Sequence, residues 1–342
     1  MNTTQHKLFL LLILFFSIYM APCSYAQQTI TDMAGRTVLL KKNTSRIIST
    51  FKPASLCVFS LGLEDRLVGI DTSSRRDRLF QAVMPDVDSI TAVGSKSAGL
   101  NFETMITLKP DLVILYAQKD GIALAQKFKK MDIPAIIILP ETFDSITTSL
   151  EIIAAASHEP DRAVRVKTAM NTLLFKISER TDTIPEAEKK TGYFASPRGL
   201  FSTATGNMLQ DEMFHMAGIS NVAHDLNGYF QDISPEQLIN WNPDIIFFSQ
   251  HMGRLPVKTF ENPAFQTIKA VRSGRIYKFP SNLAPWDFPS PLSVLGVLWL
   301  GNKAYPDIFK DIPMEKTIDD FHRILFNKTF RKMKGRTGGT VF

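Results

Sequence analysis

The sequence predicts an α/β protein built from two similar lobes, and two copies of one short pattern are the first reason. Residues 101–114 and residues 234–247 each have the pattern of a short helix that runs directly into an apolar strand. In each copy a glutamate, Glu103 or Glu236, stands in the first helical turn, and a Pro-Asp pair follows the helix. The spacing from glutamate to proline is seven residues in both copies, which indicates two lobes with a carboxylate at the same structural place.

Each copy carries residues that start and stop a helix. Asn101 and Ser234 are residue types that cap helix N-termini, and Pro235 suits the first helical position. A glutamate in the first turn is favoured by the helix dipole. The Pro-Asp pair that follows cannot continue a helix and directs the chain into an extended strand.

The first lobe begins with a hairpin and continues as an alternation of strands and helices. Residues 29–40 are expected to form the hairpin, with its turn at Ala34-Gly35. Strands alternating with helices predict a largely parallel sheet that is covered on both faces. We assign residues 27–144 to this lobe. The strands are expected at residues 46–50, 67–70, 112–116 and 133–139, and the helices at residues 54–62, 102–108 and 122–131.

A segment without strand signals separates the two lobes. Over residues 145–182 apolar side chains recur at helical spacing, and the Glu159-Pro160 pair is expected to divide the segment into two helices. The longer helix would have about 20 residues and a length of roughly 30 Å. We therefore expect residues 145–184 to form a helical spine between the lobes.

The second lobe repeats the alternation, and we assign residues 185–330 to it. The last residues, 331–342, are rich in lysine and arginine, and we expect them to form a basic flexible tail. Besides the second copy of the pattern, strands are expected at residues 191–195, 245–249 and 275–279, and helices at residues 208–217, 263–270, 293–304 and 318–327.

The N-terminal residues, 1–26, have the composition of a secretory signal. Lys7 precedes an apolar run over residues 8–19, and small residues offer a cleavage site after Ala26. The apolar run is too short to span a bilayer comfortably. Cys23 raises the alternative of a lipoprotein anchor, but a proline stands where such a motif needs a small flexible residue. Export to the periplasm as a soluble protein is therefore the preferred prediction.

Charge and cysteine content exclude other classes of protein. The chain has 39 basic and 33 acidic residues, a net charge of +6. This excess is mild and lies partly in the C-terminal tail, so nucleic-acid binding is not indicated. Once the signal is removed, Cys57 is the only cysteine, and no intramolecular disulfide can form.

With these segments placed, the chain resembles the class III periplasmic solute-binding proteins of ABC importers, the group that includes ferric-siderophore, haem and vitamin B12 binders. The resemblance covers nearly the whole mature chain, and it depends on the order and spacing of many weak motifs. Besides the two copies of the helix-strand pattern, these motifs lie at residues 30–38, 46–49, 68–70, 216–222, 273–277, 285–291, 299–300 and 305–306.

The resemblance implies two Rossmann-like lobes joined by one long rigid helix, with a ligand cleft between them. It implies a monomeric, non-catalytic periplasmic component, without a cofactor, that captures a metal chelate (iron-siderophore, haem or corrinoid) and delivers it to a membrane permease. It also implies that Glu103 and Glu236 are exposed on the lobe tips and engage arginines of a dimeric permease. Stabilisation of each glutamate by its helix dipole is the simpler alternative.

Candidate ligand contacts follow the strand ends, because ligands of open α/β sheets bind beyond the carboxyl ends of the strands. In the first lobe this rule selects Lys52, Ser95 and Tyr116, and in the second lobe it selects Ser249 and His251. A lysine at a helix start is electrostatically unfavourable, which favours an anionic ligand near Lys52. The competing interpretations are a solvated loop lysine, a tyrosine that packs at a strand end and a histidine on a polar rim.

Three further candidates lie in the second lobe. Ser202 and Thr203 match a loop at the cleft edge and offer hydroxyl donors. Trp286 matches positions that commonly face the ligand in the family, so the resemblance implies that its ring lines the cleft. A structural role in packing is the alternative for Trp286.

The ligand class stays open between a metal chelate and a small oxyanion such as molybdate or tungstate. A wide cleft with several aromatic side chains would favour a chelate, whereas a small pocket of backbone N–H groups and hydroxyls would favour an oxyanion. A bare metal ion fits poorly, because the six histidines are scattered along the sequence. A hydrolase is disfavoured, since the sequence has no Gly-x-Ser-x-Gly elbow, phosphate loop or His-Glu-x-x-His motif. A ligand-sensing subunit would share all of these features.

Overall fold

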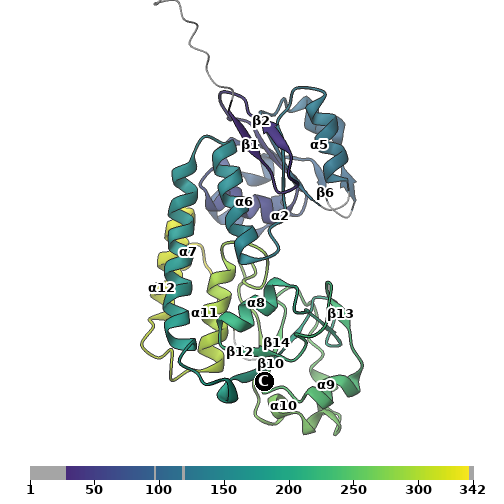
Figure 1. The fold of residues 1–342 in the computed structure, drawn as a ribbon, viewed down its shortest axis with the longest axis vertical. Helices are drawn as coiled ribbons and strands as arrows, with labels where there is room; N and C mark the ends of the chain where they lie inside the picture. The colour runs from purple at the N-terminus through teal and green to yellow at the C-terminus, as the bar shows by residue number, and fades with distance from the viewer. Residues whose placement is uncertain (1–27, 96–97, 118–119, 339–342) are drawn as a thin grey trace, which may run out of the picture.

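Two α/β lobes lie one above the other, and long helices connect them along one side (Figure 1). The structure is a computed structural model that describes residues 28–95, 98–117 and 120–338, so the predicted signal peptide lies outside the described residues. Within these ranges no helix combines the length and the apolar character that a membrane span needs. The predicted two-lobe α/β architecture is confirmed.

A parallel sheet forms the centre of the N-terminal lobe (N-lobe), with strand order β5-β4-β3-β8-β9. Consecutive residues of one strand pack on opposite faces: Ile114 lies in the cluster with α2 and α6, and Val113 in the cluster with α4 and α5. Because both faces are covered, the strands are apolar along their length. The elements are β3 (Ile47–Ser49), α2 (Lys52–Ser60), β4 (Leu67–Ile70), β5 (Thr91–Ala92), α4 (Phe102–Thr107), β8 (Leu112–Tyr116), α5 (Gly121–Lys129), β9 (Ala135–Ile138) and α6 (Phe143–Ala156).

The predicted N-terminal hairpin is present and is tied to this sheet. Gly35 supplies the positive φ of its turn, at +72°. Asp32 accepts hydrogen bonds from the backbone N–H groups of Arg36 and Ile137, both at 3.0 Å, and so joins the hairpin to β9. The hairpin strands are β1 (Thr29–Thr31) and β2 (Thr37–Leu39), and the smaller elements of the N-lobe are α3 (Arg78–Val83), β6 (Gly94–Ser95) and β7 (Gly99–Leu100).

The spine between the lobes is a layer of helices from both lobes. The 22-residue helix α7 (Pro160–Thr181) begins at Pro160, where the sequence predicts the break after α6. It packs against α6 and against two C-terminal helices, α11 (Ser293–Ala304) and α12 (Met314–Phe326). Val166, Met170, Leu173 and Ile177 are its buried stripe at helical spacing. The connection between the lobes is therefore packed against helices of both lobes rather than free-standing.

The C-terminal lobe (C-lobe) has a mixed sheet with strand order β13-β11-β10-β14-β15, and β12 also pairs with β10. Strands β12, β10, β14 and β15 are parallel, whereas β11 and β13 are antiparallel additions at one edge. The elements are β10 (Lys190–Ala195), β11 (Ser202–Thr203), α8 (Leu209–Met216), β12 (Ile219–Asn221), β13 (Gln231–Asp232), α9 (Pro235–Trp241), β14 (Ile245–Phe248), α10 (Lys269–Arg272) and β15 (Ile276–Lys278).

The two copies of the helix-strand pattern have the same local structure. Asn101 caps α4 by accepting a hydrogen bond from the backbone of Thr104 at 3.0 Å, and Ser234 caps α9 by accepting one from the backbone of Gln237 at 3.1 Å. The residue before each Pro-Asp pair has a left-handed backbone, with φ of 47° in the N-lobe and 46° in the C-lobe.

The aspartates of the two Pro-Asp pairs also act alike. Asp111 accepts a hydrogen bond from the backbone N–H of Arg46 at 3.2 Å, just before β3. Asp244 accepts one from the backbone N–H of Thr191 at 2.9 Å, in β10. Each aspartate therefore fixes the start of the strand beside its own, and the two lobes are equivalent at this point.

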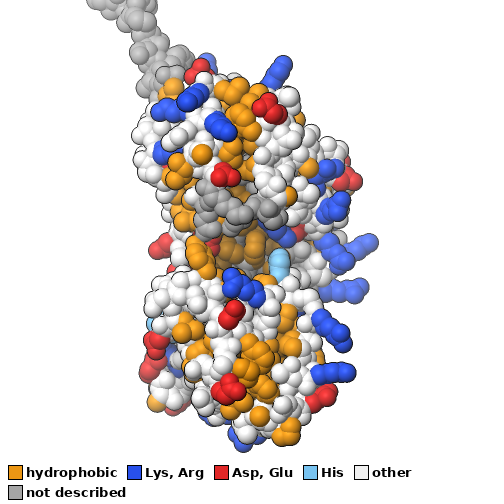
Figure 2. All heavy atoms as spheres, turned by 90° about the vertical axis from the view of Figure 1, so that its right-hand side faces the viewer, with side chains coloured by type: hydrophobic (Ala, Val, Ile, Leu, Met, Phe, Trp, Pro, Cys, Tyr) orange, Lys and Arg blue, Asp and Glu red, His pale blue; other side chains and the backbone are white. Residues whose placement is uncertain are grey.

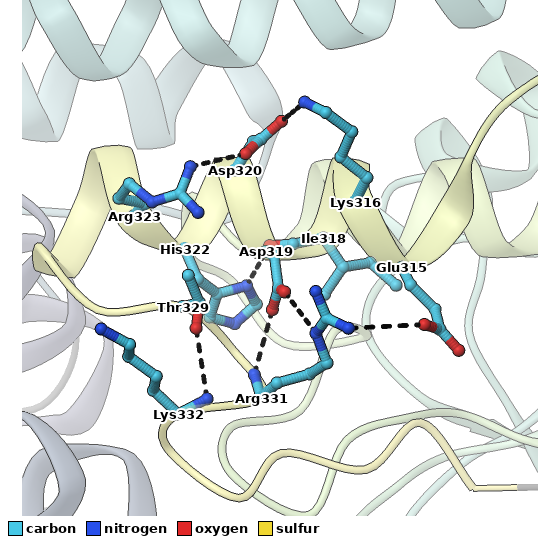
Figure 3. A network of polar contacts seen from close by, with 10 residues as sticks. All are labelled: Glu315, Lys316, Ile318, Asp319, Asp320, His322, Arg323, Thr329, Arg331 and Lys332. Atoms are coloured by element: carbon cyan, nitrogen blue, oxygen red, sulfur yellow. Dashed lines mark hydrogen bonds and ion pairs between the residues drawn. The ribbon is translucent and has the colours of Figure 1, made fainter.

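The C-terminal segment corrects one prediction. The sequence predicts a flexible tail over residues 331–342, but the chain is bonded to the protein body as far as Arg336, whose backbone N–H and carbonyl both form hydrogen bonds with Asn282. Phe330 and Met333 are buried. Between them, Arg331 donates two hydrogen bonds to the Asp319 carboxylate of α12, from its backbone N–H at 3.0 Å and from Nε at 2.6 Å (Figure 3). Burial of Phe330 and Met333 and the bonds from Arg331 to Asp319 hold this segment in place.

Candidate ligand-binding cleft

The lobes face each other across a cleft. Figure 2 shows a hollow between them, with hydrophobic side chains inside it and a histidine at its edge. Strand ends of both sheets carry residues that meet here, as expected for open α/β sheets. Two parts of the cleft are described in turn: a cluster where the lobes meet, and a pocket in the N-lobe.

The first part is the interlobe cluster, which consists of Lys52, Asp77, His251 and Phe288. Lys52 is the first residue of α2, three residues after Ser49 ends β3. Its Nζ lies 2.6 Å from a carboxylate oxygen of Asp77 and 5.9 Å from the ring centroid of Phe288 in the C-lobe. Lys52 is therefore partly neutralised by an N-lobe acid and faces an aromatic ring of the other lobe.

His251 approaches the same ring from the C-lobe. It follows β14, and its imidazole stacks on Phe288 with ring centroids 5.4 Å apart and planes 16° apart. Burial lowers the pKa of His251 below its ordinary value, and the neighbouring positive charges of Lys52 and Lys278 lower it further. The structure thus brings Lys52 and His251, both selected by the strand-end rule, into one cluster.

The second part is the N-lobe pocket, with a volume of about 320 Å³. Ser95 and Tyr116, both predicted from the strand-end rule, line it together. The Tyr116 ring packs against Phe51 with centroids 4.7 Å apart. The other described lining residues are Thr50, Gly99, Leu100, Phe102, Leu115, Asp120, Gly121, Ala123, Leu124 and Lys127.

The phenol of Tyr116 is held in its neutral form. Its hydroxyl donates a hydrogen bond to Glu141. Burial raises the pKa of Tyr116 above its ordinary value, and the Glu141 carboxylate and Tyr229 raise it further. Tyr229 belongs to the C-lobe and is more than half exposed. Tyr116 is therefore a neutral aromatic surface at the cleft rather than an anionic ligand group.

Trp286 does not line the cleft. Its side chain is fully buried, and its ring lies 5.9 Å from Phe330 of the C-terminal segment. The ring that reaches the cleft is Phe288, two residues later and half-buried. Trp286 therefore packs inside the C-lobe, as its structural alternative expects, and Phe288 of the same motif, residues 285–291, is the partly exposed aromatic residue.

The predicted hydroxyl donors lie inside the C-lobe. Ser202, Thr203 and Ser249 are all buried, so their hydroxyls are not on the cleft surface. The Ser249 hydroxyl instead accepts a hydrogen bond from the backbone N–H of His251 at 3.3 Å. Its role in this structure is to shape the turn that presents His251.

Asp287 is a further residue of this site that carries no signal in the sequence. This residue is buried, and one carboxylate oxygen accepts a hydrogen bond from the backbone N–H of Gln250 at 3.1 Å. Burial raises the pKa of Asp287 to about 6. The bond joins the loop that carries His251 to the loop that carries Phe288, so Asp287 holds the two C-lobe members of the interlobe cluster together.

Glu103 and Glu236 belong to neither the interlobe cluster nor the lining of the N-lobe pocket. Both are exposed, each in the first turn of its helix. The hydrogen bonds that the Glu236 carboxylate accepts from its own backbone N–H and from Ser234 lower its pKa. In the described part of the chain, no group of three or more His, Cys, Asp or Glu side chains is arranged to hold a metal ion.

Comparisons with known proteins agree with this architecture. A family model described as periplasmic binding protein matches residues 47–283. YvrC of Bacillus subtilis, an uncharacterized ABC transporter substrate-binding lipoprotein, is 27% identical over 288 residues, which cover 83% of this chain and 87% of YvrC. The molybdate-binding protein MolA of Haemophilus influenzae is 22% identical over 334 residues, which cover 90% of this chain and 93% of MolA.

Solved structures show the same fold. A periplasmic solute binding protein from Veillonella parvula aligns with a TM-score of 0.77 and 25% identity, over 88% of this chain and 93% of that protein. CeuE of Helicobacter pylori with Ni(II) bound aligns with a TM-score of 0.76 and 24% identity, over 90% and 99%. The family match spans more than half of the chain, which therefore belongs to the periplasmic binding protein family and is a substrate-binding component of an ABC importer.

Proposed function

We propose that this protein binds a metal chelate in the cleft and delivers it to a dimeric permease. The observation that carries the proposal is the interlobe cluster, where Lys52 of one lobe and His251 of the other meet at Phe288. A ligand seated there contacts both lobes. Phe51 and Tyr116 add aromatic surface beside it. Large aromatic walls with a few polar groups suit a chelate, which is bulky and partly apolar.

The names of several relatives support the chelate class. The Fe(3+)-citrate-binding protein YfmC of Bacillus subtilis is 28% identical over 230 residues, or 64% of this chain. A vitamin B12-binding protein of Vibrio campbellii is 26% identical over 208 residues, or 60% of this chain. Both ligands are metal complexes much larger than an oxyanion.

A small oxyanion is the second candidate, because MolA is similar to this chain over almost its whole length. An oxyanion site needs several convergent N–H donors. Beside the interlobe cluster, however, the backbone N–H groups of Gln250 and His251 are already bonded to Asp287 and Ser249. Because these two N–H groups are not available to an oxyanion, the arrangement favours a chelate as the ligand.

Calorimetric titration with ferric citrate, cobalamin and sodium molybdate separates the two candidates. The proposal expects saturable binding of at least one metal complex and no saturable binding of molybdate. Saturable binding of molybdate alone would contradict it. A Phe288→Ala variant serves as the site control, since it removes the ring shared by both lobes.

We also propose that Glu103 and Glu236 dock the protein on the permease, one glutamate for each permease subunit. Their equivalent positions support this, because helix-dipole stabilisation alone does not require a glutamate at the same place in both lobes. Two equivalent charges suit a partner with two-fold symmetry. Charge pairs at such a rim set the encounter rate and the register more than the affinity.

Export with cleavage after Ala26 is the final part of the proposal. The charged start, the short apolar run and the small residues before Gln27 support it. N-terminal sequencing of the protein from its own host should begin at Gln27. A diacylated Cys23 would instead make this chain a lipoprotein, as YvrC is.

A further inference from the structure

The N-lobe pocket lies beside the interlobe cluster but is separate from it. The two are adjacent in the chain, because Phe51 lines the pocket and Lys52 belongs to the cluster. The pocket extends from there toward α4 and α5 of the N-lobe. A ligand held at the interlobe cluster can therefore reach into the pocket with a side group.

A glycine makes the pocket possible. A Cβ atom at Gly121 would lie 1.9 Å from the backbone oxygen of Tyr116, so only glycine allows α5 to begin this close to the end of β8. The close approach brings Ala123, Leu124 and Lys127 to the pocket wall. Leu124 and Lys127 are three residues apart, and Ala123 and Lys127 four, so all three share one face of the helix.

The lining combines aromatic walls with one charge of each sign. Phe51 and Tyr116 form one wall. The Lys127 ammonium lies 5.5 Å from the ring centroid of Phe102. Asp120 occupies the N-cap position of α5, without a side-chain capping hydrogen bond. It stands seven residues before Lys127, so the two Cα atoms are about 10 Å apart along the helix axis. A group with a negative end is repelled by Asp120 and attracted by Lys127, which fixes its orientation in the pocket.

We propose that the N-lobe pocket is a subsite for an aromatic arm of the ligand, with an anionic oxygen on the arm directed to Lys127. The size fits, because a cavity of about 150 Å³ lined by apolar side chains already holds a benzene ring, and this pocket has about twice that volume. That the arm belongs to a chelate rests on the proposed function. The subsite itself is defined by the pocket residues alone.

Sodium salicylate is the direct probe, since it is a single aromatic ring with anionic oxygen. Its binding to the full chain is measured by saturation-transfer NMR. Ala123→Phe fills the pocket from an exposed helix position, and it should weaken salicylate binding at least tenfold, a change of about 1.4 kcal/mol. Ile122→Phe is the matched control: it places a phenyl ring at the preceding residue, which is exposed and is not among the described lining residues of the pocket, and it should leave binding unchanged.

A second variant tests the charge. Lys127→Met should weaken salicylate but leave the binding of benzyl alcohol, a neutral ring of similar size, unchanged. The proposal is overturned if the unaltered protein does not bind salicylate, or if Ala123→Phe and Ile122→Phe bind it equally well. Neither outcome depends on a chelate, so the subsite can fail while chelate capture stands, and chelate capture can fail while salicylate still binds.

Discussion

Lys52 of the N-lobe and His251 of the C-lobe meet at one aromatic ring. The Lys52 ammonium lies 5.9 Å from the centroid of Phe288, and the His251 imidazole stacks on the same ring at 5.4 Å. Burial, Lys52 and Lys278 lower the pKa of His251, and Asp77 opposes them. His251 is therefore neutral at pH 7, and the cleft gains a further positive charge only in acid.

This relationship predicts how ligand affinity depends on pH. As the pH falls below about 6.5, the ordinary pKa of histidine, protonation of His251 should increase the affinity for an anionic chelate. The gain should be about threefold to tenfold, as expected for one added charge in a partly solvated site. Calorimetry with ferric citrate at a series of pH values measures it.

The matched variant is His251→Asn, which keeps a polar side chain but cannot gain a charge. Protonation of ferric citrate itself changes both titrations equally, so the difference between the two proteins reports His251 alone. The same pH dependence in both proteins would show that His251 does not act on the ligand.

Phe288 and Trp286 should respond in opposite ways to truncation. Phe288→Ala should weaken ligand binding by about 1 to 3 kcal/mol with little loss of stability, because the ring is half-buried at the cleft. Trp286→Ala should lower the free energy of unfolding by about 3 to 5 kcal/mol, because its ring is fully buried. Calorimetric titration and urea unfolding of both variants distinguish the roles. Reversed effects would restore Trp286 as the ligand contact.

His322 should make stability depend on pH. It is buried in α12, where Nδ1 lies 2.8 Å from the Ile318 carbonyl oxygen (Figure 3), and burial lowers its pKa to about 4. Between about pH 6.5 and pH 4 the unfolded chain binds a proton that the folded chain excludes. His322 therefore contributes stability that is complete above about pH 6.5 and is lost as the pH falls toward 4, by about 3 kcal/mol.

Urea unfolding at several pH values tests this contribution. His322→Gln should show a shallower loss of stability in acid than the unaltered protein. His215→Gln, at an exposed position on α8, is the control and should follow the unaltered protein. Parallel profiles for all three proteins would exclude the contribution of His322.

Substitution of Glu103 and Glu236 should affect transport without affecting ligand binding. Glu103→Arg combined with Glu236→Arg should leave folding and ligand affinity nearly unchanged, because both side chains are exposed and neither lines the N-lobe pocket. Uptake by cells should be abolished, and each single change should be milder.

Asp161→Arg is the matched control for transport, since it reverses another exposed carboxylate in a first helical turn. It should transport normally. If the double variant also transports normally, or if it loses ligand binding, the docking role is wrong and the glutamates act only on their helix dipoles.

Much of the fold follows from local sequence. Asn101 and Ser234 cap their helices as predicted, and the spine helix begins at Pro160. Caps and proline positions act through hydrogen bonds within a few residues, so the sequence alone reveals them. The strand-end rule also selects Ser95 and Tyr116, which line one pocket. Tyr116 is the last residue of β8, and Ser95 lies three residues beyond the end of the parallel strand β5.

The positions of Trp286 and of the C-terminal segment differ from the predictions because they depend on contacts with distant parts of the chain. Trp286 is buried partly because Phe330, 44 residues later, covers it. The C-terminal segment is fixed because Arg331 pairs with Asp319 and because Met333 is buried. Neither the direction of a side chain in an irregular loop nor a contact between such loops has a periodic signal in the sequence.

Native mass spectrometry of the protein purified from its own host tests capture of a metal chelate most directly. We expect a complex whose excess mass is that of a metal chelate. The Phe288→Ala variant, purified in the same way, should lack that excess mass. An excess mass equal to molybdate or tungstate, or a chelate retained undiminished by Phe288→Ala, would contradict it.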